Sequence, residues 1–209
     1  MREHIYNYIN VSKLIELHKP KLVLELGSAG LQTTIQLWGL MYKTSFKLIT
    51  VDDNPQTIFV PEPYEENWYY YQGISYEFLK LYPDIEMDKV FKGKFDMVLI
   101  DTDHNYWTLD KEIKALEPHL TDDAIILFHD TRRKNPHDTI LYRGYACEYE
   151  YPIDKINTMR RPMVEAVDEW VERSDYKVIR ETQSEEGCMA ISKVKPYMKI
   201  LRWKLSNHF

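Results

Sequence analysis

The sequence is poor in three features, each of which would indicate a particular class of protein. It has only two cysteines, Cys147 and Cys188, far apart and without metal-ligand spacing, so neither a disulfide scaffold nor a zinc site is indicated. It has no basic excess: the formal charge of -6 and the pI near 5.7 argue against a large nucleic-acid-binding surface. No apolar run approaches the length of a membrane span, and residues 1–10 lack the pattern of a signal peptide. A small-molecule ligand and a reducing, cytoplasmic location are therefore expected.

The apolar residues that are present suffice for one well-filled core. The chain has 209 residues, of which 44% are hydrophobic, which is enough for one domain and short for two. We find no linker, internal repeat or low-complexity tract. A single domain over residues 1–209 is therefore expected.

Apolar runs of strand length alternate with stretches of helical spacing along the chain. The expected strands are KLVLEL (21–26), FKLITV (46–51), NWYYYQG (67–73), FDMVLI (95–100), AIILFH (124–129), YKVIRET (176–182) and GCMAISKV (187–194). The expected helices span residues 5–18, 32–42, 75–83, 106–117 and 162–174. Apolar strands separated by helices are typical of a parallel sheet that is covered on both faces. The pattern predicts a Rossmann-like, doubly wound α/β fold with a mainly parallel seven-stranded sheet and a C-terminal antiparallel hairpin.

Ionisable and glycine residues follow the first five strands at the point where each strand ends. They are Glu25 with Gly27 and Gly30, Asp52, Gly73 with Ser75, Asp101 with Asp103 and His104, and His129 with Asp130. Each acid alone would be explained as a cap of the following helix. In open parallel sheets, however, ligands bind outside the carboxyl ends of the strands. Taken together, these residues favour a ligand site at that edge.

The first two strand ends distinguish between possible cofactors. A glycine turn such as ELGSAG (25–30) lets the backbone approach a ligand closely. The carboxylate of Asp52 is suited to accept hydrogen bonds from both ribose hydroxyls of an adenosine group. Glu25 would repel the pyrophosphate of a dinucleotide but attract the ammonium and sulfonium groups of S-adenosylmethionine. The residues therefore favour S-adenosylmethionine over NAD or a flavin dinucleotide.

Five stretches, in this order, resemble the class I S-adenosylmethionine-dependent methyltransferases. They are LELG (24–27), LITVDDNP (48–55), QGIS (72–75), FDMVLIDTDHNY (95–106) and AIILFHDT (124–131). The chain is most similar to metal-dependent O-methyltransferases of the catechol and caffeoyl-CoA type and their bacterial cephalosporin-hydroxylase-like relatives. The resemblance is close over about residues 20–130 and looser over 160–194. It implies that the cofactor is bound by Glu25, Gly27, Ser28, Gly30, Asp52, Asp53, Gly73, Ile74, Ser75 and Asp101.

The same resemblance implies a divalent metal ion at the ends of the fourth and fifth strands. Asp101 and Asp130 stand where the family has metal-binding aspartates, and such oxygen ligands suit Mg²⁺, with Mn²⁺ as the alternative. The third ligand stays open. Thr131 stands where the family usually has asparagine, His129 would shift the preference toward softer metals, and Asp103 is a further candidate.

His104 and Asp101 are the predicted catalytic residues. His104 follows Asp101 by three residues, where the catechol enzymes carry a lysine that acts as a general base, and an imidazole accepts a proton near neutral pH. The predicted function is an O-methyltransferase that acts on a hydroxyl of a small molecule such as a sugar, natural product or phenol. Two alternatives stay open: a metal-independent methyltransferase, and a non-catalytic S-adenosylmethionine-binding protein.

Two segments fall outside the matched stretches. Residues 131–160, which combine tyrosines and arginines, are interpreted either as a lid over the acceptor or as an ordinary surface loop. Residues 195–209 carry four lysines or arginines and no acid, which favours a dimer or core-edge element over a membrane-surface helix. A homodimer is therefore considered among the partners.

Overall fold

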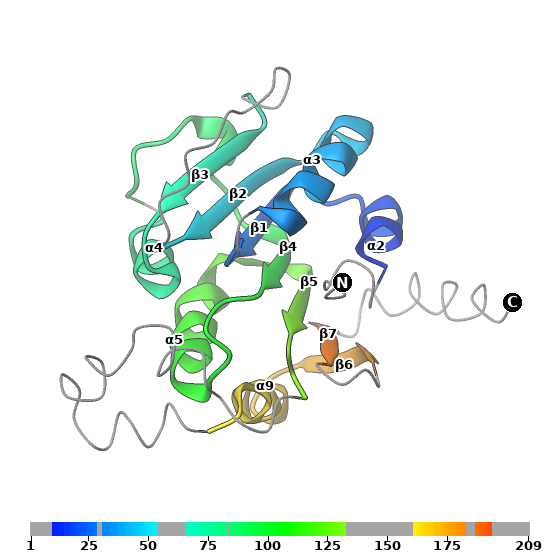
Figure 1. The fold of residues 1–209 in the computed structure, drawn as a ribbon, viewed down its shortest axis with the longest axis vertical. Helices are drawn as coiled ribbons and strands as arrows, with labels where there is room; N and C mark the ends of the chain where they lie inside the picture. Colours follow the sequence, from blue (N-terminus) through cyan, green and yellow to red (C-terminus); the bar gives the residue numbers. More distant parts are fainter. Residues whose placement is uncertain are drawn as a thin grey trace, which may run out of the picture.

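The computed structural model of the protein describes residues 10–28, 31–53, 66–82, 84–132, 161–182 and 187–193. Within these ranges, seven strands form one sheet in the order β3-β2-β1-β4-β5-β7-β6 (Figure 1). The strands are β1 (Leu22–Leu26), β2 (Lys47–Asp52), β3 (Trp68–Gln72), β4 (Phe95–Ile100), β5 (Leu120–His129), β6 (Tyr176–Glu181) and β7 (Cys188–Lys193). Strands β1 to β5 are parallel, and β7 is antiparallel to both β5 and β6. This arrangement confirms the predicted fold class, including the C-terminal antiparallel hairpin.

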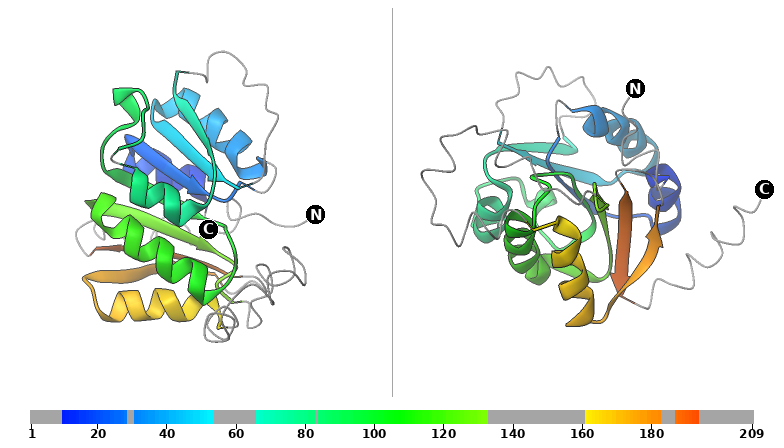
Figure 2. Two further views of the ribbon diagram at one scale, coloured as in Figure 1. Left: turned by 90° about the vertical axis from the view of Figure 1, so that its left-hand side faces the viewer. Right: turned by 60° about the horizontal axis from the view of Figure 1, so that its bottom comes forward.

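Helices cover both faces of the sheet. They are α2 (Val11–His18), α3 (Gln32–Thr44), α4 (Ser75–Leu81), α5 (Tyr106–Leu116) and α9 (Met163–Glu172). Figure 2 shows α4, α5 and α9 on one face, with α2 and α3 on the other. Alternate residues of each central strand contribute to the two cores: Leu24 belongs to the core that includes residues of α4, α5 and α9, whereas Val23 belongs to the core that includes residues of α2 and α3. Because both faces are buried, the strands read as continuous apolar runs.

Most element boundaries lie close to those predicted, and two differences have local causes. β5 begins at Leu120 instead of residue 124, because the polar residues 121–123 lie in an irregular part of the β4–β5 ladder and resemble a loop in sequence. The first predicted helix, 5–18, is described as Val11–His18, with Asn10 as its N-cap. The Asn10 side chain accepts a hydrogen bond from the Lys13 N–H at 3.1 Å. Residues 1–9 lie outside the described ranges.

The parallel strands bring their carboxyl ends to a common edge of the sheet. This edge collects the residues after β1, β2, β3, β4 and β5, which are the positions that the sequence indicated. Most of the predicted lid (133–160), the basic tail (195–209) and Gly30 lie outside the described residues. Among the helices of the described part, none has the length and apolar composition that a bilayer crossing requires.

Candidate functional site

Glu25 is buried in β1, beneath the edge where the predicted cofactor site lies. Its Oε2 accepts hydrogen bonds from the hydroxyls of Thr34 at 2.6 Å and Thr50 at 2.8 Å. Its Oε1 is also buried and has no hydrogen-bond partner among the described residues. Burial raises the pKa of Glu25 to about 7; the two hydroxyls oppose this shift, and the negative charges of Asp101 and Asp52 add to it. The free protein therefore holds this carboxyl close to the point where it ionises at neutral pH.

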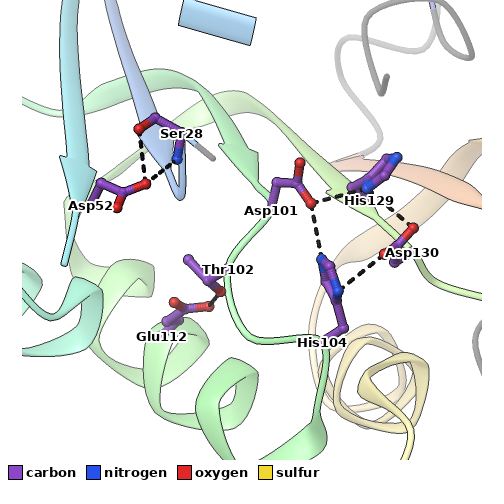
Figure 3. A network of polar contacts seen from close by, with 8 residues as sticks. All are labelled: Ser28, Asp52, Asp101, Thr102, His104, Glu112, His129 and Asp130. Atoms are coloured by element: carbon purple, nitrogen blue, oxygen red, sulfur yellow. Dashed lines mark hydrogen bonds and ion pairs between the residues drawn. The ribbon is translucent and has the colours of Figure 1, made fainter. Parts of the chain in front are cut away.

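Asp52 ends β2 and holds the turn that follows β1. Its Oδ2 accepts hydrogen bonds from the Ser28 backbone N–H at 2.6 Å and the Ser28 hydroxyl at 2.8 Å (Figure 3). Gly27 has a φ of 80°, and a Cβ at this position would lie 2.2 Å from the carbonyl oxygen of Asp101. Only glycine lets the turn pass so close to the end of β4. Asp53, the residue that follows β2, is exposed.

The connection from β3 to α4 adds the residues that were predicted to border adenine. The Gly73 N–H donates to the carbonyl of Asp52 at 2.9 Å, which fixes this connection against the end of β2. Ile74 is partly exposed, with 37% of its surface accessible, whereas Ser75 is buried. The Ser75 hydroxyl donates a hydrogen bond to a carboxylate oxygen of Glu112. Ile74 therefore presents an apolar surface at this edge, and Ser75 fixes the β3–α4 connection through its hydrogen bond to Glu112.

Glu112 is a buried carboxyl group of the site region that sequence reasoning missed. It lies on α5 and also accepts a hydrogen bond from the Thr102 hydroxyl at 3.0 Å (Figure 3). Together with its contact to Ser75, this bond ties the loop after β4 to the start of α4. Burial raises the pKa of Glu112 to about 8, against the lowering effect of its two hydroxyl partners. One sequence signal was present: Glu112 lies at helical spacing with Leu109, Ile113 and Leu116 on the buried face of α5.

Four ionisable side chains meet at the ends of β4 and β5 (Figure 3). Asp101 Oδ1 lies 3.0 Å from Nε2 of His104 and 3.0 Å from Nδ1 of His129. The carboxylate of Asp130 contacts the same two rings: its Oδ2 lies 3.0 Å from His104 Nδ1, and its Oδ1 lies 3.2 Å from His129 Nδ1. Both histidines thus bridge the two aspartates, a relation between distant segments that the sequence alone did not reveal.

The charges of this cluster stabilise one another. Burial disfavours the ionised form of Asp101, but hydrogen bonds from His104 and His129 and the charges of these rings hold its pKa well below its usual range. Burial also lowers the pKa of His129, but its hydrogen bond to Asp101 and the charges of Asp101 and Asp130 give a net increase. Asp130 has a left-handed φ of 58°, a conformation that non-glycine residues seldom adopt and that recurs at functional sites.

Three members of the cluster have the geometry of a metal site. Asp101, His104 and His129 each offer one donor atom, and these atoms all lie within 4.8 Å of one another. Asp103, which was also considered as a ligand, is not in this group, and its Oδ2 accepts a hydrogen bond from the Thr108 hydroxyl at 3.2 Å. Mg²⁺ prefers oxygen ligands, whereas two of the three donors here are imidazole nitrogens. The donor set therefore fits Mg²⁺ poorly and suits ions that accept imidazole.

The described site residues form two neighbouring groups at one edge of the sheet. Ser28 and Asp52 belong to the group at β1 and β2, and the histidine–aspartate cluster lies at β4 and β5 (Figure 3). Thr131, one of the candidates for the third metal ligand, is buried next to the second group, and its hydroxyl has no hydrogen-bond partner among the described residues. The assignment of these residues to cofactor and metal stays a prediction.

Comparisons with known proteins identify a family and a shared fold. Residues 24–131 match the model of a family described as a methyltransferase domain. A search of curated proteins found no match. Among solved structures, an O-methyltransferase from Bacillus cereus in complex with SAH is 13% identical, with a TM-score of 0.59 over 92% of this chain and 83% of that chain. The O-methyltransferase TomG from Streptomyces achromogenes, solved with SAM, is 14% identical, with a TM-score of 0.57 over 92% and 81% of the two chains.

A third solved structure carries a metal ion. The MycE methyltransferase from the mycinamycin biosynthetic pathway, in complex with Mg, SAH and mycinamycin VI, is 14% identical, with a TM-score of 0.55. The match covers 88% of this chain and 48% of that chain. At such low identities, these likenesses show that the fold is shared.

Proposed function

The chain belongs to a family of methyltransferase domains, and from this premise we propose that it transfers the methyl group of S-adenosylmethionine to a hydroxyl of a small molecule. The family match agrees with the resemblance carried by the five sequence stretches. Three proteins of the same fold support the cofactor, since they were solved with SAM or SAH. MycE, which was solved with mycinamycin VI, supports a small-molecule acceptor.

The observation that carries the proposal is a group of three carboxyl side chains at the ends of adjacent strands. Glu25, Asp52 and Asp101 belong to β1, β2 and the end of β4, and the charges of Asp52 and Asp101 both act on Glu25. Such a site attracts the cationic ammonium and sulfonium groups of S-adenosylmethionine and repels the pyrophosphate of a dinucleotide. The buried Oε1 of Glu25, which has no partner among the described residues, provides an acceptor for the ammonium group.

The remaining cofactor contacts follow from the neighbouring loops. The Asp52 carboxylate, whose Oδ2 accepts hydrogen bonds from Ser28, would also accept hydrogen bonds from the ribose hydroxyls. The partly exposed side chain of Ile74 would lie against adenine, and Ser75, held by Glu112, would fix the position of that loop.

The chemistry requires a nucleophilic oxygen in line with the bond that breaks. S-adenosylmethionine supplies a methyl group on a positively charged sulfur, and the acceptor must present an ionised hydroxyl opposite to it. The residues that would lie beside this position are Asp101, His104 and His129. His104 would act as the proton acceptor only after one of its ring nitrogens leaves an aspartate, because both nitrogens face carboxylate oxygens. A divalent ion, when bound there, would lower the pKa of a hydroxyl that contacts it.

Two measurements test the proposal. Calorimetry should show that the protein binds S-adenosylmethionine and does not bind NAD. Incubation with a panel of sugars, phenols and hydroxylated natural products should then give a product that gains one methyl group by mass spectrometry, with S-adenosylhomocysteine formed in equal amount.

Each alternative predicts a different result. Failure to bind S-adenosylmethionine would refute the proposal, and binding without transfer to any acceptor would favour the non-catalytic alternative. Full activity in EDTA would favour the metal-independent enzyme. The cytoplasmic location and the homodimer stay predictions, and sedimentation analysis would test the second.

A further inference from the structure

We propose that Asp101, His104 and His129 bind a first-row transition-metal ion, such as Zn²⁺, Co²⁺ or Fe²⁺, in preference to Mg²⁺. The inference rests on the proposed function only for the role of the ion, which would lie beside the acceptor hydroxyl. The binding itself rests on the donor atoms of these three side chains and on the neighbouring carboxylate of Asp130.

The three donor groups converge on one small region. Nε2 of His104 and Nδ1 of His129 both lie 3.0 Å from the same oxygen, Oδ1 of Asp101. The three donor atoms come from the loop after β4 and from the ends of β4 and β5, and they lie within 4.8 Å of one another. Two imidazoles and one carboxylate constitute a donor set used by catalytic zinc and non-haem iron sites, in which the remaining positions stay open for water or substrate.

Asp130 supports the three donor groups through its contact with the outer ring nitrogen of His104. His104 directs Nε2 toward Asp101 and Nδ1 toward Oδ2 of Asp130, at 3.0 Å in each case. A ring nitrogen that donates to a carboxylate while the other nitrogen binds a metal is the usual outer contact of a metal-bound histidine. The side chain of Asp130 is only 1% exposed, whereas those of Asp101 and His104 are 19% and 14% exposed. An ion can therefore enter from the side of Asp101 and His104, with Asp130 as the fixed support.

The nitrogen donors decide which ion is preferred. Mg²⁺ requires near-octahedral oxygen ligands and loses its water reluctantly, so exchanging two oxygens for imidazoles weakens its binding. Imidazole suits zinc, iron and the other later first-row ions. His129 influences the ion preference more than His104 does. It occupies the end of β5, where an acid or an amide would have given a donor set dominated by oxygen atoms.

The competing explanation for the same contacts is a purely structural network of hydrogen bonds and ion pairs that binds no metal ion. Without an ion, two charged imidazoles between two carboxylates would neutralise one another, and the cluster would serve only to hold β4 and β5 in place. This explanation predicts no specific ion binding, which makes the two explanations separable by direct titration.

The test uses the full chain after treatment with a chelator and dialysis. Separate calorimetric titrations with Zn²⁺, Co²⁺ and Mg²⁺ measure the affinities, and visible absorption of the Co²⁺ complex reports nitrogen ligands independently of activity. We expect one equivalent of Co²⁺ or Zn²⁺ to bind at least about tenfold more tightly than Mg²⁺.

Two variants assign the ligands, and a third serves as the control. His129→Asn and His104→Gln should each weaken Co²⁺ binding by about tenfold or more and alter its absorption band. His119→Gln is the matched control, because His119 lies beside Tyr82 and away from the cluster, and it should bind Co²⁺ like the wild type. Circular dichroism of each variant checks the fold. If one variant fails to fold, the other and the wild-type ion preference still decide the question.

The outcomes separate this inference from the proposed function. Mg²⁺ affinity equal to or above that of Co²⁺, no ion binding, or unchanged Co²⁺ affinity in both variants would overturn the inference, even if methyl transfer is observed. Unchanged Co²⁺ affinity in His104→Gln alone, with a reduced kcat, would return His104 to the role of general base and overturn its assignment as a ligand. Tight Co²⁺ binding without binding of S-adenosylmethionine would support the metal site and refute the proposed function.

Discussion

At pH 6 the buried carboxyl of Glu25 is expected to be mostly protonated, so S-adenosylmethionine should release a proton when it binds. The pKa of Glu25 is raised to about 7 in the free protein, chiefly by burial. The ammonium group of the cofactor favours the ionised form, because opposite charges attract strongly where water is excluded. With that pKa, binding should release about 0.9 proton at pH 6 and about 0.5 proton at pH 7. The affinity should rise by about fivefold from pH 6 to pH 7 and by only about twofold more above pH 7.

The substitution Glu25→Gln tests this coupling with little change in shape. The amide oxygen still accepts hydrogen bonds from Thr34 and Thr50, but the side chain no longer titrates. The variant should bind S-adenosylmethionine more weakly at pH 7 by about 1.5–3 kcal/mol, the scale of a charge-assisted hydrogen bond. At pH 6 this difference should be about 1 kcal/mol smaller, because the wild type must then lose a proton to bind.

Calorimetry in two buffers that differ in ionisation enthalpy measures the protons released. The protein is first treated with EDTA, so that the histidine–aspartate cluster is in the same state throughout. Glu16→Gln, which changes an exposed carboxyl of α2, is the control and should keep the wild-type release. Equal proton release in the wild type and Glu25→Gln, or an affinity that does not change between pH 6 and pH 7, would refute the reasoning.

Three further substitutions test the cofactor loop, the buried acid of α5 and the glycine turn. Asp52→Ala should weaken S-adenosylmethionine by about 1.5–3 kcal/mol, and unchanged affinity in calorimetry would remove the ribose assignment. Glu112 has a pKa raised from 4.5 to about 8, so its contribution to stability is complete below pH 4.5 and is lost as the pH rises through about 8. Urea unfolding of the wild type should therefore lose about 3 kcal/mol from this group between pH 4.5 and pH 7, and Glu112→Gln should lack that loss; identical pH profiles would contradict the burial argument. Gly27→Ala should destabilise the fold by about 2 kcal/mol or more, because the φ of 80° and the contact with the end of β4 both oppose a Cβ. Gly39→Ala, in a helix with open space around it, is the control and should be neutral or stabilising in thermal unfolding.

The strands and the edge that carries the site were predictable because their signals are local. Runs such as FDMVLI are buried on both faces, and a parallel sheet places their carboxyl ends together whatever the details of packing. The bridge from His104 to Asp130 was not predictable, because it depends on the left-handed backbone of Asp130 and on the β4–β5 register. The contact of Glu112 with Ser75 was missed for a similar reason. It joins two helices whose relative position only the packed structure defines.

The place of β7 in the sheet has a consequence for how the protein is made. This strand lies between β5 and β6, and its first residue, Cys188, is paired with His129 at the end of β5. The N–H of Thr131 also donates to the carbonyl of Gly187, at 3.3 Å. While the ribosome is still adding residues before 188, β5 has an open edge, and the backbone beyond His129 lacks these contacts. The half of the candidate site around Ser28 and Asp52 needs only β1, β2 and β4, whereas the histidine–aspartate half acquires its final support only when β7 has emerged and inserted.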